Sequence, residues 1–171
     1  MPHWGKGGRF GVSDLPVIYS GQGFSQRGDK DRYVLPAGFR KAVTASSGGT
    51  TLLVSKHASW NCLIGFGESR RASLVAEIDR EQEMAVRAGQ PFDRDMRYFQ
   101  LFDCTEISFD NSGRFVIPRH LRDLVGLNGG IYFQGSGPFF TLWSPEVLAA
   151  QEGSQWASAQ AACASLAGGG K

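Results

Sequence analysis

The sequence predicts an α+β fold built from a duplicated unit, with a helical insertion between the two copies. Three observations carry this prediction. Residues 106–127 alternate apolar and polar side chains around a turn and then continue into a short helix. Residues 24–43 repeat that pattern, and the segment that separates the copies is rich in helix-forming residues.

The clearer copy begins with two predicted strands. Apolar residues alternate with others over 107–109 and again over 115–117, as they do in half-buried strands. The intervening Asn111-Ser112-Gly113 is a turn-forming cluster whose glycine adopts a positive φ without steric cost. The sequence therefore predicts a tight hairpin turn flanked by Asp110 and Arg114, close enough to form an ion pair.

A short helix is expected directly after this turn. Pro118 ends the second strand and suits a helix start, where its missing N–H costs nothing. Leu121, Leu124 and Val125 form an apolar stripe, and Gly126 suits the helix end.

The earlier copy matches the later one at a constant offset. Pro36 and Pro118 lie 82 positions apart, and the same shift places Arg32 on Arg114, Phe39 on Leu121, Arg40 on Arg122 and Val43 on Val125. Each copy is followed by two further apolar runs, which predict a second hairpin. We infer an internal duplication, with a first unit over 19–66 and a second over 103–152.

The segment 67–102 is predicted to be a two-helix insertion. Residues 68–88 lack proline and glycine, and Asp93 suits the N-cap of a second helix that ends near residue 102. Met96, Phe99 and Phe102 recur on one side of that second helix. Such a stripe favours core packing; packing against a neighbouring subunit is the second interpretation.

The two ends of the chain lack periodicity. Residues 1–18 are rich in glycine and predict a flexible extension. Ser144, Pro145 and Glu146 predict a helix start, whereas the Ala-, Ser- and Gly-rich composition of 153–171 predicts a disordered tail.

Positive charge gathers on the duplicated units. The net charge is only +2. Residues 27–41 nevertheless carry five basic against two acidic side chains, and residues 110–122 carry three against one. The insertion, by contrast, balances six arginines with seven acids over 68–97. This distribution favours an anionic partner for the turns.

Several classes of function are not supported by the sequence. Three widely spaced cysteines without a CxxC pair predict neither disulfides nor a zinc site, and they fit a reducing cytoplasm. No apolar run is long enough to predict a membrane span. Catalytic motifs are missing from the sequence. Asp110 and Glu106 could form an acid/base pair, but it is a better explanation that Asp110 pairs with Arg114 in the turn and that Glu106 is an exposed strand residue. We expect no enzyme activity, cofactor, metal or small-molecule substrate.

The basic turns predict DNA binding. A two-stranded ribbon fits the major groove, where arginine bonds guanine or backbone phosphates. The alternative is that Arg32 and Arg114 only bond their own turns.

These residues are similar to those of the MraZ family of transcriptional regulators, within the AbrB-type swapped-hairpin superfamily. The matching residues are Tyr19-Ser20-Gly21, Lys30, Arg32, Pro36, Phe39-Arg40, Asp110 to Arg114, Leu121-Arg122 and Phe140 to Trp143. The resemblance implies two AbrB-like half-units that form one β-barrel-like core, and chains that assemble into a ring. It also implies binding to tandem repeats upstream of a cell division and cell wall operon, and hence a cytoplasmic, nucleoid-associated protein.

One departure from the family pattern affects the expected site. The family's DxxxR aspartate falls on Gly28, and the usual turn glycine falls on Asp31. Aspartate tolerates the left-handed conformation, so the turn is still expected to form, although more loosely. The expected DNA-binding residues are Arg27, Lys30, Arg32 and Arg114, with Lys30 and Arg32 leading. An antitoxin-like protein-interaction module of the same superfamily is the alternative function.

Overall fold

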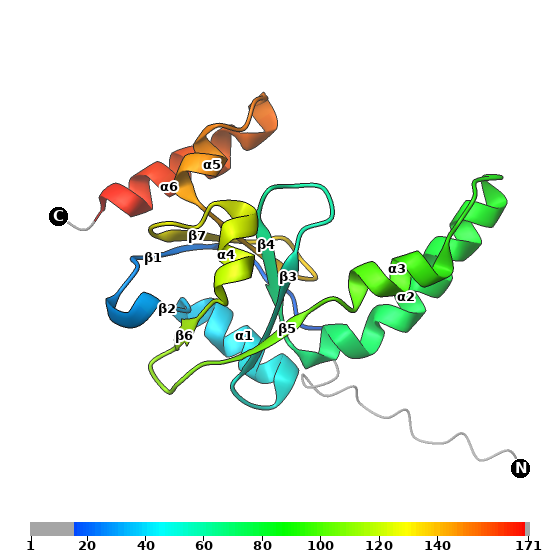
Figure 1. Cartoon of the computed structure of the whole chain (residues 1–171), viewed down its shortest axis with the longest axis horizontal. Coiled ribbons are helices and arrows are strands. Elements are labelled where there is room, and N and C mark those ends of the chain that lie inside the picture. Colours follow the sequence, from blue (N-terminus) through cyan, green and yellow to red (C-terminus); the bar gives the residue numbers. More distant parts are fainter. Residues whose placement is uncertain (1–15, 170–171) are drawn as a thin grey trace, which may run out of the picture.

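The computed structural model describes residues 16–169 and has a mixed α+β architecture, as predicted (Figure 1). Its strands are β1 (Gln22–Ser25), β2 (Arg32–Val34), β3 (Thr51–Lys56), β4 (Leu63–Phe66), β5 (Thr105–Ser108), β6 (Arg114–Val116), β7 (Ile131–Gly135) and β8 (Phe140–Trp143). Its α-helices are α1 (Ala37–Ser47), α2 (Glu68–Arg87), α3 (Arg94–Leu101), α4 (Arg119–Val125), α5 (Pro145–Ala149) and α6 (Ala157–Gly168). Two 3₁₀ turns, η2 (Asp29–Asp31) and η3 (Ser154–Trp156), complete the described elements.

The strands form one large and one small antiparallel sheet. The six-stranded sheet has the order β1-β7-β8-β4-β3-β5, and β2 pairs with β6 in a separate two-stranded sheet. Among the described residues the large sheet is open, with β1 and β5 at its edges, so the expected barrel-like closure is not seen.

The two units exchange strands with each other. β1 of the first unit pairs with β7 of the second, and β5 of the second unit pairs with β3 of the first. The two strands that flank each predicted tight turn therefore pair with strands of the other unit and not with each other. The later hairpins, β3–β4 and β7–β8, form within their units as predicted.

The helices after β2 and β6 have matching ends. α1 follows Pro36 and α4 follows Pro118, and both helices end at glycines with positive φ, Gly48 at 68° and Gly126 at 67°. Phe39 of α1 packs on Phe140, with ring centroids 4.9 Å apart, inside a core to which both units contribute. The duplication seen in the sequence is therefore repeated in the backbone at both ends of these helices.

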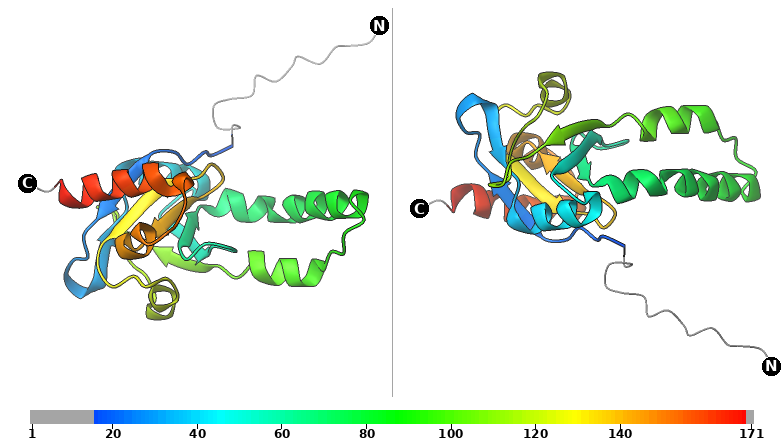
Figure 2. Two further views of the ribbon diagram at one scale, coloured as in Figure 1. Left: turned by 90° about the horizontal axis from the view of Figure 1, so that it is seen from above. Right: turned by 90° about the horizontal axis from the view of Figure 1, so that it is seen from below.

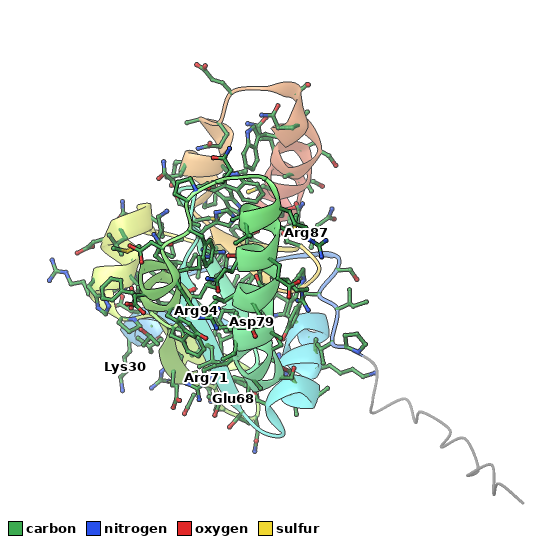
Figure 3. The ribbon with its side chains drawn as sticks, turned by 90° about the vertical axis from the view of Figure 1, so that its right-hand side faces the viewer. Lys30, Glu68, Arg71, Asp79, Arg87 and Arg94 are labelled. Carbon is green, nitrogen blue, oxygen red and sulfur yellow. The ribbon has the colours of Figure 1, made fainter. Side chains whose placement is uncertain are left out.

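The insertion is a helical hairpin that projects from the sheet (Figure 1). Asp93 caps α3 as predicted, because its carboxylate accepts the Met96 N–H at 3.0 Å. Figure 3 looks onto this hairpin, where ion pairs join α3 to α2: Arg94 with Asp79 at 2.6 Å and Arg97 with Glu81 at 2.7 Å.

The predicted core packing of the α3 stripe is wrong. Met96, Phe99 and Phe102 are 50%, 74% and 39% exposed, and α3 has no buried residue. The helix meets α2 through its charged side chains instead, which leaves its apolar side outward. Periodicity correctly predicts that one side of the helix is apolar, but it does not specify whether the protein core packs against that side.

The predicted disordered tail is also wrong for most of its length, because η3 and α6 occupy residues 154–168. Trp156 packs edge-on against Trp60 and Trp143, with ring centroids at 5.0 and 5.4 Å. The amide of Gln160 donates to the Leu148 and Gln151 carbonyls at 3.0 and 2.9 Å. Figure 2 shows α6 across the strands at the opposite end of the molecule from α2 and α3. The aromatic contacts of Trp156 and the hydrogen bonds of Gln160 thus order a segment whose composition alone indicates disorder.

The flexible extension expected at the other end of the chain covers residues 1–18. All but the last three of these residues lie outside the described part.

Candidate nucleic-acid interface

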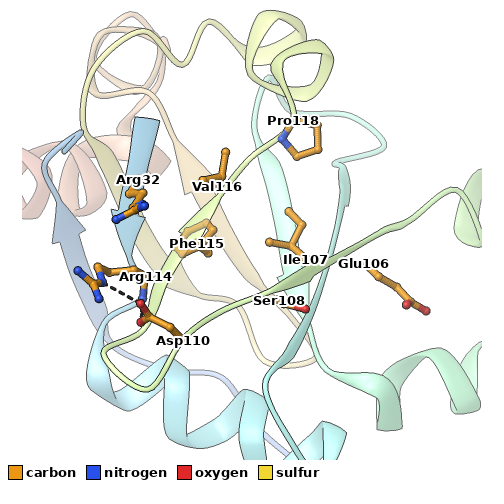
Figure 4. Close-up of a pocket in the computed structure, with 9 residues that line it drawn as sticks. All are labelled: Arg32, Glu106, Ile107, Ser108, Asp110, Arg114, Phe115, Val116 and Pro118. Atoms are coloured by element: carbon orange, nitrogen blue, oxygen red, sulfur yellow. Dashed lines mark hydrogen bonds and ion pairs between the residues drawn. The ribbon is translucent and has the colours of Figure 1, made fainter. Parts of the chain in front are cut away.

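The ribbon formed by β2 and β6 has one buried and one exposed side. The opposed residues are Arg32 with Val116, Tyr33 with Phe115, and Val34 with Arg114. Tyr33 and Phe115 point into the core, with ring centroids 6.1 Å apart. The remaining four side chains lie on the outer side, which we call the ribbon face: Arg32, Val34, Arg114 and Val116. Two distant segments thus place two arginines together on one exposed surface (Figure 4).

The second turn, before β6, is held by Asp110. One carboxylate oxygen accepts the backbone N–H groups of Ser112 and Arg114, each at 2.9 Å, and the other accepts Arg114 Nε at 2.8 Å. The hydrogen bond from the Arg114 backbone, followed by that from its guanidinium, lowers the pKa of Asp110 below its usual value. Arg114 is therefore on the ribbon face but already paired with an acid.

The first turn, before β2, closes with the equivalent backbone hydrogen bond. Gly28 N–H donates to the Arg32 carbonyl at 2.7 Å, as Asp110 N–H does to that of Arg114 at 3.0 Å. Asp31 stands where the second turn has its glycine and adopts φ = 59°. The expectation that aspartate would tolerate this conformation is confirmed.

A different ion pair stabilises the first turn. Arg27 donates to the Asp31 carboxylate through Nε at 2.8 Å and through Nη2, and its Nη1 donates to the Asn128 carbonyl at 2.9 Å. The hydrogen bond from Arg27 lowers the pKa of Asp31. Gly28 has no carboxylate, so within residues 16–169 no acid pairs with Arg32. Arg27 is thus held in the turn, whereas Arg32 and the exposed Lys30 have no ion-pair partner in the described chain.

Two further arginines, which no sequence motif marks as site residues, also lie against the turns. Arg40 donates to the Leu35 carbonyl at 3.0 Å, and its guanidinium fills the space beside Gly113, where a Cβ would lie 2.4 Å from Nε. Its repeat equivalent, Arg122, lies 3.8 Å from the Asp31 carboxylate. Each arginine therefore supports the turn of the other unit. The 82-residue match marked both positions, but only as part of the repeat.

Equivalent hollows flank the ribbon face. They measure about 500 and 550 Å³, and both are lined by Arg32 and Arg114. One is also lined by Ile107, Asp110, Val116 and Pro118, and the other by the repeat equivalents Ser25, Gly28, Val34 and Pro36. The surface is thus a basic ribbon with a depression on each side.

Metal binding, a membrane span and nucleophilic catalysis by a buried thiol have little support within residues 16–169. Residues 16–169 contain no cluster of three or more histidine, cysteine or acidic side chains able to hold a metal ion. No helix in the same range is long and apolar enough to cross a membrane. Burial raises the pKa of the Cys62 thiol to about 12, which makes it a poor nucleophile.

Comparison with known proteins identifies relatives of similar length. No family model matches the chain. The chain is 31% identical to the transcriptional regulator MraZ of Rhodospirillum rubrum over 124 residues, which cover 72% of this chain and 77% of that protein. It is 34% identical to the MraZ of Parvibaculum lavamentivorans over 124 residues, covering 71% and 72% of the two chains. With the MraZ of Caulobacter vibrioides the identity is 31% over 130 residues, covering 76% and 79%.

The duplicated fold, the basic ribbon and these relatives define a transcriptional regulator and not an enzyme. The chain belongs to the MraZ family. The family resemblance noted in the sequence is therefore confirmed.

Proposed function

We propose that this regulator binds double-stranded DNA sequence-specifically through its ribbon face. The observation that carries the proposal is Arg32, an exposed arginine on a paired strand, with no acidic partner among residues 16–169 and with Arg114 on the same surface. A two-stranded ribbon fits the major groove, which is about 12 Å wide, and an arginine there bonds guanine bidentately. Lys30, on the adjoining turn and without an ion-pair partner in the described chain, is suited to backbone phosphates. Arg27 has a supporting role there, because Asp31 already offsets its charge.

The target we propose is a set of short tandem repeats upstream of a cell division and cell wall operon, with the protein acting in the cytoplasm at the nucleoid. This part rests on membership of the MraZ family. The exchange of strands between units supports the finer fold assignment, two AbrB-like swapped-hairpin half-units, which we also propose.

We further propose that several copies assemble, as a ring, so that many ribbons meet many repeats. The exposed Met96 and Phe99 of α3 offer apolar surface for such assembly. Linked weak contacts then act jointly through effective concentration. An antitoxin-like module has less support, because the C-terminal segment that would serve as a free toxin-binding arm is packed as α6.

Selection of bound duplexes from a random DNA pool tests the proposal directly. We expect the enriched sequences to contain a short repeated element. Mobility-shift assays on that duplex should then show binding about 5- to 150-fold weaker for Arg32→Ala, because a bidentate contact contributes roughly 1–3 kcal/mol. Arg87→Ala is the matched control, an exposed arginine at the far end of α2 with no ion pair in the described chain (Figure 3).

Equal binding by Arg32→Ala and the wild type would reject the site. Failure of the wild type to enrich any sequence would reject the function.

A further inference from the structure

The ribbon face carries two valines as well as two arginines. Val34 is 44% exposed and Val116 is 45% exposed. Each valine lies directly opposite an arginine, Val34 opposite Arg114 and Val116 opposite Arg32. The exposed surface is therefore made of two arginine–valine pairs related by the internal repeat.

Strand propensity alone explains a valine on a sheet, since β-branched side chains favour strands. On each strand the central, inward position is filled by Tyr33 or Phe115, so the residues on either side of it face outward. Strand propensity does not explain why one outward residue of each strand is apolar. Polar residues are usual on the outer side of a half-buried ribbon. Two exposed valines at the centre of a basic surface therefore indicate an apolar feature on the partner.

The backbone holds Val34 in a fixed position. Its N–H donates to Ser25 Oγ at 2.8 Å, and the next N–H, of Leu35, donates to the Gly113 carbonyl at 2.8 Å. These contacts come from β1 and from the second turn, so the outward side chain is presented by a rigid frame. Such a frame favours recognition of a partner group at a defined place.

In the major groove the apolar feature is the C5-methyl group of thymine. Directly opposed residues of an antiparallel pair have Cβ atoms about 4.5–5.5 Å apart. Successive base pairs are about 3.4 Å apart. One arginine–valine pair is thus the right size to contact two neighbouring base pairs, the arginine on a guanine and the valine on an adjacent thymine methyl.

We propose that Val34 and Val116 are specificity-determining residues, each contacting the C5-methyl of a thymine next to the base pair bound by its opposed arginine. This inference rests on the proposed DNA-binding function. It goes beyond that function by assigning sequence selectivity to two uncharged residues.

Replacing thymidine by deoxyuridine in the duplex tests the contact between valine and the thymine methyl group without changing the protein. Uracil pairs as thymine does but lacks the methyl group. With the enriched duplex as probe, we substitute one thymine at a time and measure the affinity of the wild type. Burial of one methyl-sized group contributes about 0.8 kcal/mol, so we expect about fourfold weaker binding at the contacted positions and no change elsewhere.

Protein variants then identify the residue that makes each contact. Val34→Ser should bind the thymine probe about fourfold more weakly and lose the difference between thymine and uracil at one position. Val34→Thr retains one methyl group and β-branching, so it should keep part of that difference. Val116→Ser should act in the same way at a second position.

Val75→Ser is the matched control, because Val75 is also 44% exposed but lies on α2, away from the ribbon. It should leave the thymine–uracil difference intact. Equal affinity for every thymine and uracil probe, or enriched duplexes without thymine beside guanine, would overturn this inference. If binding is tight and depends on Arg32 while uracil has no effect, only the valine contacts are rejected; if the wild type enriches no sequence, the DNA-binding function itself is rejected.

Discussion

The two turns that lead into the ribbon share a backbone hydrogen bond but differ in the placement of their acid. In the second turn, Asp110 precedes the turn and pairs with Arg114 on the ribbon face. In the first, the acid has moved to Asp31, at the tip, and pairs with Arg27 before the turn. The ion pair is thereby shifted off the ribbon.

This difference separates two tasks that the second turn combines. Arg114 both stabilises its turn and lies on the ribbon face, whereas Arg27 stabilises the first turn and leaves Arg32 free of an acidic partner in the described chain. A duplicated motif has thus kept its closing backbone hydrogen bond while redistributing its charges. The turn backbones also differ, because Lys30 and Asp31 both have a positive φ in the first turn and only Gly113 does in the second. Four predictions test this comparison.

Removal of each ribbon arginine should have distinct consequences. We expect Arg32→Ala to weaken DNA binding about 5- to 150-fold with an unchanged midpoint of urea unfolding. Arg114→Ala should weaken binding less, because Asp110 already offsets its charge, and should also speed amide exchange in the second turn. Mobility shift, urea unfolding and hydrogen exchange measure these effects. Identical profiles for the two variants would contradict the separation of tasks.

A side chain at the glycine of the second turn should destabilise the protein more than one at a free glycine of the same backbone conformation. Gly113 has φ = 81°, and a Cβ would lie 2.4 Å from Arg40 Nε. Gly48 has φ = 68° with nothing within 4 Å of its Cβ position, so Gly48→Ala should cost only about 1 kcal/mol of unfolding free energy. Gly113→Ala should cost about 1 kcal/mol more, because the displaced Arg40 guanidinium loses its hydrogen bond to the Leu35 carbonyl. Urea unfolding that gives equal values for both variants would show that Arg40 does not support the turn.

Giving the first turn the acid and glycine positions of the second turn should create an ion pair with Arg32 on the ribbon face. Gly28→Asp combined with Asp31→Gly gives the first turn the acid and glycine positions of the second. The Cβ added at residue 28 would lie 3.2 Å from the Arg32 carbonyl, a tight but local contact. We expect the double variant to bind DNA severalfold more weakly than Asp31→Gly alone, because the new carboxylate would engage Arg32. Equal affinities would argue against charge pairing as the difference between the turns.

The two turn carboxylates should titrate differently when Arg27 is removed. Both pKa values lie below the usual aspartate value of about 3.9, so the stabilisation is complete above that pH and is lost as the pH falls through each lowered pKa. Arg27→Ala should return the pKa of Asp31 toward the usual value and leave that of Asp110 low, because Asp110 also accepts two backbone N–H groups. NMR titration of the carboxyl carbons measures both, and an unchanged pKa of Asp31 would refute the assignment.

Much of the local structure was predictable from the sequence because it depends on local chemistry. The turn at Asp110 to Arg114, the proline-started helices and the Asp93 cap all follow from residues within a few positions of one another. These are short-range effects of backbone conformation and side-chain hydrogen bonding.

The partners of the strands were not predictable in the same way. Alternation of apolar residues specifies which side of a strand is buried but not which strand lies beside it. The cross-pairing of Ser25 with Ile131 follows only from the three-dimensional arrangement. For the same reason Arg40 and Arg122 were recognisable as repeated residues but not as supports for the opposite turn. The order of α6 depends on contacts of Trp156 and Gln160 with distant residues, which composition does not describe.

The exchange of β1 has a consequence for how the chain is made. During synthesis β1 leaves the ribosome long before its partner β7, since Ser25 pairs with Ile131. At about 5–20 residues per second, the first strand waits several seconds with an unpaired edge. Neither half of the duplicated chain completes its own sheet, so truncation between the units would leave an exposed strand open to aggregation rather than a smaller folded protein.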